Sequence, residues 1–247
     1  MGLGAVKLAD MEEYVRIVMA LLRGETVEVE IERKTRLIRL LNPELGLINT
    51  RDPIPLWVAA SGPRAQALTA KLCAGWIATA GDVEGAVAAL ADMRERWHAA
   101  GHKAAALSAV VMTGGAILEE GEPADSPRAI AQAGPRAAML LHRVADAALA
   151  GLPMMSPGYV ELARKFTPQG AHYLENHRGH LMFVKPEERP FVTAELIRRT
   201  TYTATEGELK ERFAALAEAG FSEVAIQIVP GQEHAIEDWG RIRRAFV

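Results

Sequence analysis

The sequence predicts an α/β fold built on a parallel sheet. Short runs with apolar residues at successive positions alternate with longer amphipathic runs, and turn residues separate the two. Apolar runs of this kind are typical of strands buried on both faces, as in parallel sheets. The chain has 247 residues, of which 49% are hydrophobic and 24% charged, so it can bury a substantial core. No linker-like stretch divides it, and we expect one domain over residues 1–247.

The first elements differ from the rest of the chain. Apolar residues at helical spacing predict a helix over Leu8–Arg23, with Gly24 after its end. Strict alternation of apolar and charged residues over Val27–Leu37 predicts a half-exposed ribbon or hairpin. The apolar run Ile54–Ser61 is the first buried strand.

From Ser61 onward, strand, turn and helix repeat. Pro63 begins a helix that closes at Gly75, because proline lacks the N–H that a first helical residue leaves unused. The same reasoning from periodicity and turn residues predicts the later elements. These are strands at Trp76–Thr79, Ala104–Thr113 and Glu223–Val229, and helices at Val83–Ala100, Arg128–Leu149, Pro157–Asn176, Glu206–Ala219 and Ile236–Phe246.

Right-handed strand-helix-strand units place consecutive strands in one sheet. We therefore expect four strands to lie adjacent and parallel in one curved sheet, with their helices on the outer face. They are Ile54–Ala60, Trp76–Thr79, Ala106–Met112 and Glu223–Gln227. A complete eight-stranded barrel needs twice as many.

Composition excludes several classes of partner. The net charge of −3 is spread without a basic patch, so no nucleic-acid partner is expected. The longest apolar runs are far shorter than the roughly 18–20 residues that span a bilayer, so no membrane partner is expected either. A single cysteine and a start without an apolar signal region fit a cytoplasmic protein. That cysteine, Cys73, is expected to be buried on the apolar face of its helix.

Two turns follow neighbouring strands and could bind an anion. Ser61-Gly62-Pro63 and Thr79-Ala80-Gly81 both lie where a strand gives way to a helix. Backbone N–H groups at a helix start attract phosphate, and parallel α/β folds bind ligands at this edge. The alternative is that both segments are simply compact turns and helix caps.

Histidines and tryptophans are further candidates. His172, His177 and His180 lie close together in sequence, but a metal site would need additional ligands, and we predict none. A hydrogen-bonded loop at the mouth of a pocket is favoured instead. Trp57 and Trp76 are expected in the core, although either could line a flat ring.

Four segments together resemble the luciferase-like monooxygenase family, especially its deazaflavin-dependent branch. They are AASGPRAQALTAKLCAGWIATAG, LADMEEYVRIVMALLRGETVEVE, ENHRGHLMF and TEGELKERFAALAEAGFSEVAIQ, and the resemblance runs from about Lys7 to the C-terminus. It implies a TIM barrel with its cofactor, FMN or the deazaflavin coenzyme F-420, at the carboxyl face. In the family, LADMEEYV follows the fourth strand, so the first four strand-helix units have no counterpart and the barrel is incomplete.

The resemblance also implies functional residues. It places the cofactor-phosphate cradle on Ser61, Gly62, Pro63, Thr79, Ala80 and Gly81. It implies an oxidoreductase that acts on a small organic substrate by hydride transfer or oxygen insertion. The titratable character of His177 and His180, and not the resemblance, makes them candidates to orient substrate or donate a proton. Alternatives are a non-catalytic flavin-binding or dimerising protein, or a fragment of a longer enzyme. Exposed strand edges of an incomplete barrel lead us to expect a homodimer.

Overall fold

A computed structural model describes residues 6–52, 54–152 and 156–246. The chain divides into two compact units, which are taken separately below. Among the described residues, the first comprises residues 77–92 and 108–246, and the second comprises residues 6–76 and 93–107. Whether the two form the single domain expected from the sequence stays a prediction.

Four strands form the larger sheet, in the order β3-β4-β5-β8. Their bounds are Trp57–Ala59 (β3), Gly75–Ala78 (β4), Ala109–Thr113 (β5) and Glu223–Ile226 (β8). Strands β5 and β8 pair in parallel, with Val110 opposite Glu223 and Thr113 opposite Ile226. The predicted fold class is therefore confirmed: a parallel α/β sheet with four strands of a barrel.

The strands are shorter than their apolar runs. Residues 104–106, predicted as the start of a strand, form a short 3-10 helix, and β5 begins only at Ala109. The indole of Trp97 donates to the carbonyl of Lys103 at 3.0 Å, which holds the chain in a turn before the strand. Burial on both faces holds for Val110 and Val111 of β5 but not for β3, where Ala59 is exposed.

In the second unit, the predicted helix and ribbon are confirmed. Helix α1 spans Leu8–Leu22, and β1 (Val27–Ile31) pairs antiparallel with β2 (Lys34–Ile38). Glu32 and Arg33 form the turn between them with positive φ angles of 54° and 59°. Two such residues are what a tight hairpin with a two-residue loop requires.

Trp76 is a core residue as predicted, whereas Cys73 is not. Trp76 is 1% exposed, and its indole donates to the carbonyl of Ala60 at 2.8 Å. The half-buried ring of Trp57 packs so closely on Gly75 that a β-carbon there would lie 2.5 Å from it. The prediction of a buried Cys73 is wrong: α2 (Pro63–Lys71) ends first, and Cys73 is exposed with φ of 50°.

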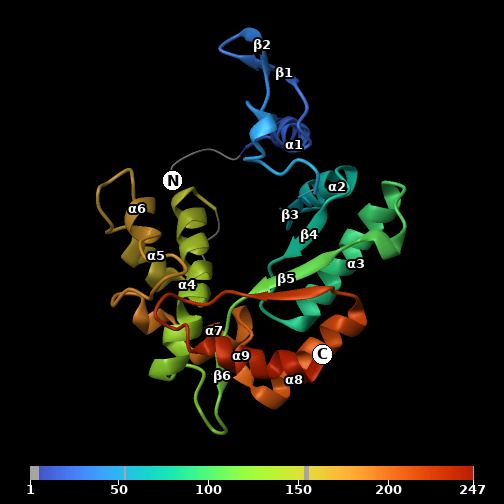
Figure 1. Cartoon of the computed structure of the whole chain (residues 1–247). Helices are drawn as coiled ribbons and strands as arrows, with labels where there is room; N and C mark the ends of the chain where they lie inside the picture. The colour runs from blue at the N-terminus through green and yellow to red at the C-terminus, as the bar shows by residue number, and fades with distance from the viewer. Residues whose placement is uncertain (1–5, 53, 153–155, 247) are drawn as a thin grey trace. The chain divides into compact units, whose positions relative to one another are not determined.

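Helix α4 (Pro127–Leu149) organises the core of the first unit (Figure 1). Its alanine-rich face lets α5 (Pro157–Ala163) and α7 (Ala194–Thr200) pack closely against it. The side chain of Ser126 caps the helix by accepting from the amide of Ala129 at 3.1 Å. Buried residues of this core include Ala133, Ala137, Leu141, Tyr159, Phe166, Val192 and Ile197.

One predicted helix is broken and two small elements were not predicted. The helix expected over Pro157–Asn176 is wrong, because α5 ends at Ala163 and α6 spans only Tyr173–Asn176. The parallel pair β6 (Ile117–Leu118) and β7 (Ala204–Thr205) is too short to leave a pattern in the sequence.

The remaining helices follow the predictions closely. Thr205 and Glu208 form a capping box that begins α8. The bounds are α3 Val83–Ala99, α8 Glu206–Ala219 and α9 Ala235–Arg243, with 3-10 helices at Pro43–Leu45, Ala104–Ala106, Arg189–Phe191 and Arg244–Phe246. Across the described ranges, no helix combines the length and apolarity that crossing a bilayer requires.

Candidate functional site

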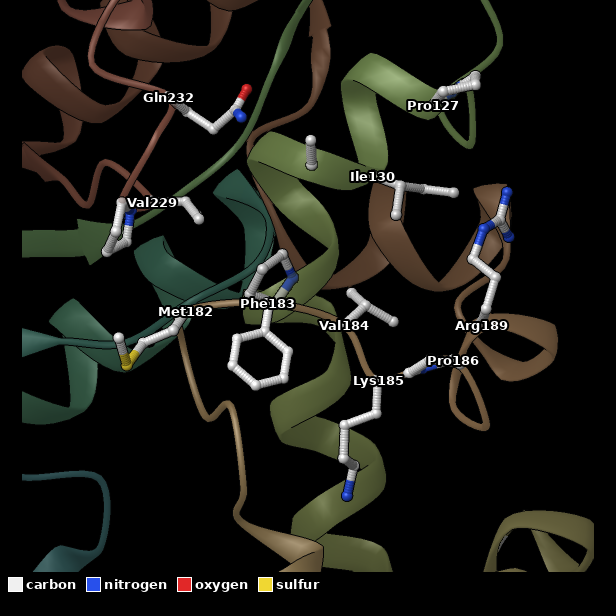
Figure 2. A pocket seen from close by; sticks show the side chains of 13 residues that line it. Pro127, Ile130, Met182, Phe183, Val184, Lys185, Pro186, Arg189, Val229 and Gln232 are labelled. Carbon is white, nitrogen blue, oxygen red and sulfur yellow. The ribbon is translucent and has the colours of Figure 1, made fainter.

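The first unit contains a cavity of about 400 Å³, here called the larger cavity (Figure 2). Three segments line it: the first half of α4, the segment Met182–Arg189, and the residues that follow β8. Figure 2 shows the stretch Met182–Pro186 crossing in front of α4. The lining is Pro127, Ile130, Ala131, Pro135, Met182, Phe183, Val184, Lys185, Pro186, Arg189, Val229, Pro230 and Gln232. Because β8 ends at Ile226, this cavity lies beyond the carboxyl end of that strand.

A second cavity, of about 170 Å³, adjoins the later turns of α4. We call it the arginine pocket, since arginines are its charged residues. Thr79, Ala80 and Gly81 line it directly after β4. The other lining residues are Arg136, Met139, Leu140 and Arg143 of α4 and Arg199 and Thr200 of α7.

Arg136 is held in an unusual position in this pocket. One terminal nitrogen donates to the carbonyl of Met112 at 2.7 Å. Its Nε is buried and has no hydrogen-bond partner among the residues that the structure describes. Burial lowers the pKa of this guanidinium from its usual value. A buried donor without an acceptor is costly, so an anion in the pocket would supply what Arg136 lacks.

The Thr79-Ala80-Gly81 half of the predicted cradle thus lies on a cationic pocket. Gly81 is required there by close packing, because a β-carbon would lie 2.4 Å from the carbonyl oxygen of Arg199. Asp82 accepts from the amide of Gly85 at 2.7 Å, so the end of this turn also caps α3.

The other half of the predicted cradle belongs to the second unit. Ser61, Gly62 and Pro63 are exposed at the start of α2, where Pro63 occupies the first helical turn as predicted. Apart from its two chain neighbours, no described residue has an atom within 4 Å of where a β-carbon on Gly62 would be. That the two halves share one phosphate stays a prediction.

The structure brings His177 and His180 together with His142 of α4. The Nδ1 atom of His180 lies 3.2 Å from Nδ1 of His142 and 3.3 Å from Nδ1 of His177. Burial, and then the charges of the other two rings, lower the pKa of His180. His172 lies outside this group and contacts Gln169 at 3.2 Å. We call His142, His177 and His180 the histidine cluster.

Two of these rings contact carboxylates through Nε2, the ring nitrogen that does not face the other histidines. Nε2 of His142 lies 2.7 Å from Oε1 of Glu188, and Nε2 of His177 lies 2.7 Å from Oδ2 of Asp146. Burial opposes ionisation of Glu188, but hydrogen bonds outweigh it and lower its pKa to about 2. Their donors are the His142 ring, the backbone and side-chain nitrogens of Lys185 and the Tyr159 hydroxyl.

The sequence analysis missed His142 and the three pocket arginines. Arg136 and Arg143 are seven residues apart, which places them on one face of a helix. That spacing was a usable signal, whereas nothing local connects Arg199 with α4 or His142 with a segment 35 residues later.

Comparisons with known proteins give the fold and the family. No curated protein sequence matches the chain. The coenzyme F420 dependent tetrahydromethanopterin reductase of Methanopyrus kandleri has a similar structure, with a TM-score of 0.58 and 18% identity. The match covers 94% of this chain and 61% of that one. An F420-dependent secondary alcohol dehydrogenase gives a TM-score of 0.55 at 13% identity, covering 97% and 63% respectively.

The chain therefore spans less than two thirds of the length of these two structures. At such identities the likeness establishes the fold. The model of the luciferase-like monooxygenase family matches residues 5–223, which is most of the chain. The protein is a member of the luciferase-like monooxygenase family.

Proposed function

We propose that this protein binds a flavin-type cofactor, coenzyme F420 or FMN, and acts as an oxidoreductase on a small organic substrate. The family supports the class of cofactor. The observation that carries the proposal is the buried Nε of Arg136, which lacks an acceptor among the described residues and lines a pocket at the carboxyl end of β4.

The arginine pocket suits a phosphate. Arg136, Arg143 and Arg199 supply positive charge, and Thr79 supplies a hydroxyl. Its volume of about 170 Å³ is small, which favours a compact anion rather than a ring system.

The larger cavity suits a ring and a substrate. Its volume of about 400 Å³ lies within the roughly 300–1,000 Å³ typical of small-molecule sites. Ile130, Phe183 and Val184 give it apolar walls, and Gln232 adds a polar group that can orient a ligand. A bound flavin or deazaflavin would supply the redox chemistry, and the protein would supply position and electrostatics. That His177 or His180 orients substrate or donates a proton also stays a prediction.

Binding of F420 and FMN, followed by fluorescence quenching, tests this proposal. A hydrogen bond to a charged group contributes about 1.5–3 kcal/mol, so Arg136→Met should weaken binding about 10- to 100-fold. Arg199→Ala should weaken it as well. Arg198→Ala is the matched control, because Arg198 is the exposed neighbour of Arg199 on α7 and does not line the pocket.

Equal affinity in the wild type and in a folded Arg136→Met variant would contradict the assignment of the phosphate. Binding without turnover of any small alcohol, aldehyde or ketone would instead favour the alternative, a non-catalytic flavin-binding protein.

A further inference from the structure

We infer that the histidine cluster is a binding site for a divalent transition metal of the zinc class. His142, His177 and His180 would supply three nitrogen ligands, and water would take the fourth position. The ligand atoms of the three residues all lie within 4.8 Å of one another. This site goes beyond the proposed cofactor binding and does not depend on it.

The distances between the ring nitrogens fit a tetrahedral site. A Zn–N bond is about 2.0–2.1 Å, which in tetrahedral geometry separates two ligand nitrogens by about 3.3–3.4 Å. The observed separations from Nδ1 of His180 are 3.2 Å and 3.3 Å. Two of the three separations therefore already match the spacing that a metal requires, and the third pair of ligand atoms lies within 4.8 Å.

Hydrogen bonds among the three rings do not explain both the contact of His180 with His142 and the contact of His180 with His177. His142 and His177 turn their Nε2 atoms toward the carboxylates of Glu188 and Asp146. If each Nε2 carries the proton that such a contact needs, both Nδ1 atoms present lone pairs to His180. His180 Nδ1 carries at most one proton to share between them. A cation would satisfy all three lone pairs together.

The carboxylates are the partners that metal-bound histidines usually have. A carboxylate behind the ring fixes its tautomer and orientation and makes the nitrogen a better ligand. Glu188 is fully buried and is itself held by the hydroxyl of Tyr159 at 2.8 Å and by Lys185 at 3.0 Å. Asp146 is held by the side-chain amide of Asn176 at 2.7 Å. The cluster is therefore preorganised on α4 and on the segment after α6.

Exposure supports exchange of the metal with solvent. His142 is buried, whereas His177 and His180 are half-buried. The fourth position therefore has access to water, and the metal has a route into the site.

The test is metal binding by untagged full-length protein after treatment with a chelator. Zn²⁺ alone, in competition with a chromophoric chelator, should bind once per chain and raise Tm, because a ligand that binds only the folded state stabilises it. Co²⁺ should give the intense visible absorption of a tetrahedral site.

Three variants make the test specific. His180→Ala should lower the affinity for Zn²⁺ at least 100-fold and abolish the cobalt spectrum. His172→Ala is the matched control and should bind like the wild type, because His172 belongs to the same segment but not to the cluster. Asp146→Asn should weaken binding about 10- to 100-fold, the effect expected for a partner behind a ligand.

His180→Ala is the decisive variant because, among the described residues, His180 makes no hydrogen bond to a carboxylate, so its loss keeps the bonds between Glu188 and its partners. Circular dichroism confirms that each variant folds. Absence of stoichiometric Zn²⁺ binding by the wild type would overturn the inference, and so would wild-type affinity in folded His180→Ala.

Discussion

Gly81 and Arg199 meet so closely that a β-carbon on the glycine would lie 2.4 Å from the carbonyl oxygen of the arginine. The turn after β4 therefore rests directly on the backbone of the last turn of α7. This contact sets one wall of the arginine pocket, where both residues are found.

Gly81→Ala should consequently destabilise the protein. The backbone at Arg199 and Thr200 must move to admit the methyl group, and such overpacking costs about 1–3 kcal/mol. Urea unfolding measures the loss. Gly207→Ala is the control, because its β-carbon enters open space in α8 and should leave stability equal or higher. A Gly81→Ala variant as stable as the wild type would mean that the backbone around the turn shifts without a measurable free-energy cost.

Gly62→Asp tests the other half of the predicted cradle. A β-carbon at this position would meet no described atom within 4 Å apart from its chain neighbours, so the free energy of unfolding should change by less than about 0.5 kcal/mol. If the cofactor phosphate also contacts the Ser61-Gly62-Pro63 turn, the new carboxylate should abolish F420 or FMN binding. Fluorescence titration measures this, and unchanged affinity would leave the segment as a simple helix start.

Glu122 should make the stability of the protein depend on acid pH. Hydrogen bonding to Arg128 lowers its pKa from 4.5 to about 2, aided by Ser126 and the amide of Glu119. Because the folded-state pKa is the lower one, the stabilisation is complete above pH 4.5 and is lost as pH falls through about 2.

Glu122→Gln should therefore cost about 1–3 kcal/mol near neutral pH, and the difference from wild type should shrink between about pH 5 and pH 2. Denaturant unfolding at several pH values measures it. Glu120→Gln, at an exposed neighbouring position, should change little at any pH. A penalty independent of pH would contradict the role given to the charge of Glu122.

Lys185→Met should lower the free energy of unfolding more than most single substitutions. Lys185 and Glu188 are both fully buried, and the ammonium lies 3.0 Å from the carboxylate. It also donates to the carbonyl of Glu175 at 2.5 Å. Removing one partner of a buried ion pair costs about 3–5 kcal/mol. Here the buried Glu188 carboxylate would lose its ammonium partner and keep its contacts with His142 and Tyr159. Thermal unfolding measures this, with exposed Lys165→Met expected to match the wild type.

Homodimer formation is tested through exposed leucines of the second unit. Leu45 and Leu47 are 61% and 80% exposed, and contact with a second chain would remove apolar surface of these side chains from water. We expect a dimer at micromolar concentration by sedimentation, and a shift toward monomer in a Leu45→Ser, Leu47→Ser double variant. A monomeric wild type would contradict the prediction.

Local chemistry predicted the hairpin and most of the helices, with the helix over Pro157–Asn176 as the exception. The capping box at Thr205 and Glu208 begins α8 at the predicted residue, and alternating charges revealed β1 and β2. Strand ends were less predictable, because hydrogen bonds such as Trp97 to Lys103 decide where pairing begins. Cys73 was misplaced because α2 ends before it.

Only some residues of the candidate sites could be predicted from the sequence. Thr79-Ala80-Gly81 follows a strand, and this position predicts a ligand site. Arg199 joins it through the packing of α7, and His142 joins His177 and His180 through the packing of α4. Such contacts depend on the tertiary fold, so no periodicity or motif in the sequence predicts them.

Helix α4 lines both cavities, the larger one from Pro127 to Pro135 and the arginine pocket from Arg136 to Arg143. At a rise of about 1.5 Å per residue, Ile130 and Arg143 lie about 20 Å apart along its axis. The length of the helix therefore fixes the distance between the residues that line the two cavities. A ligand that fills both cavities must be elongated, with its anionic group separated from its ring by a linker. Pro135, the last α4 residue that lines the larger cavity, removes one hydrogen bond of the helix next to Arg136, the first that lines the arginine pocket.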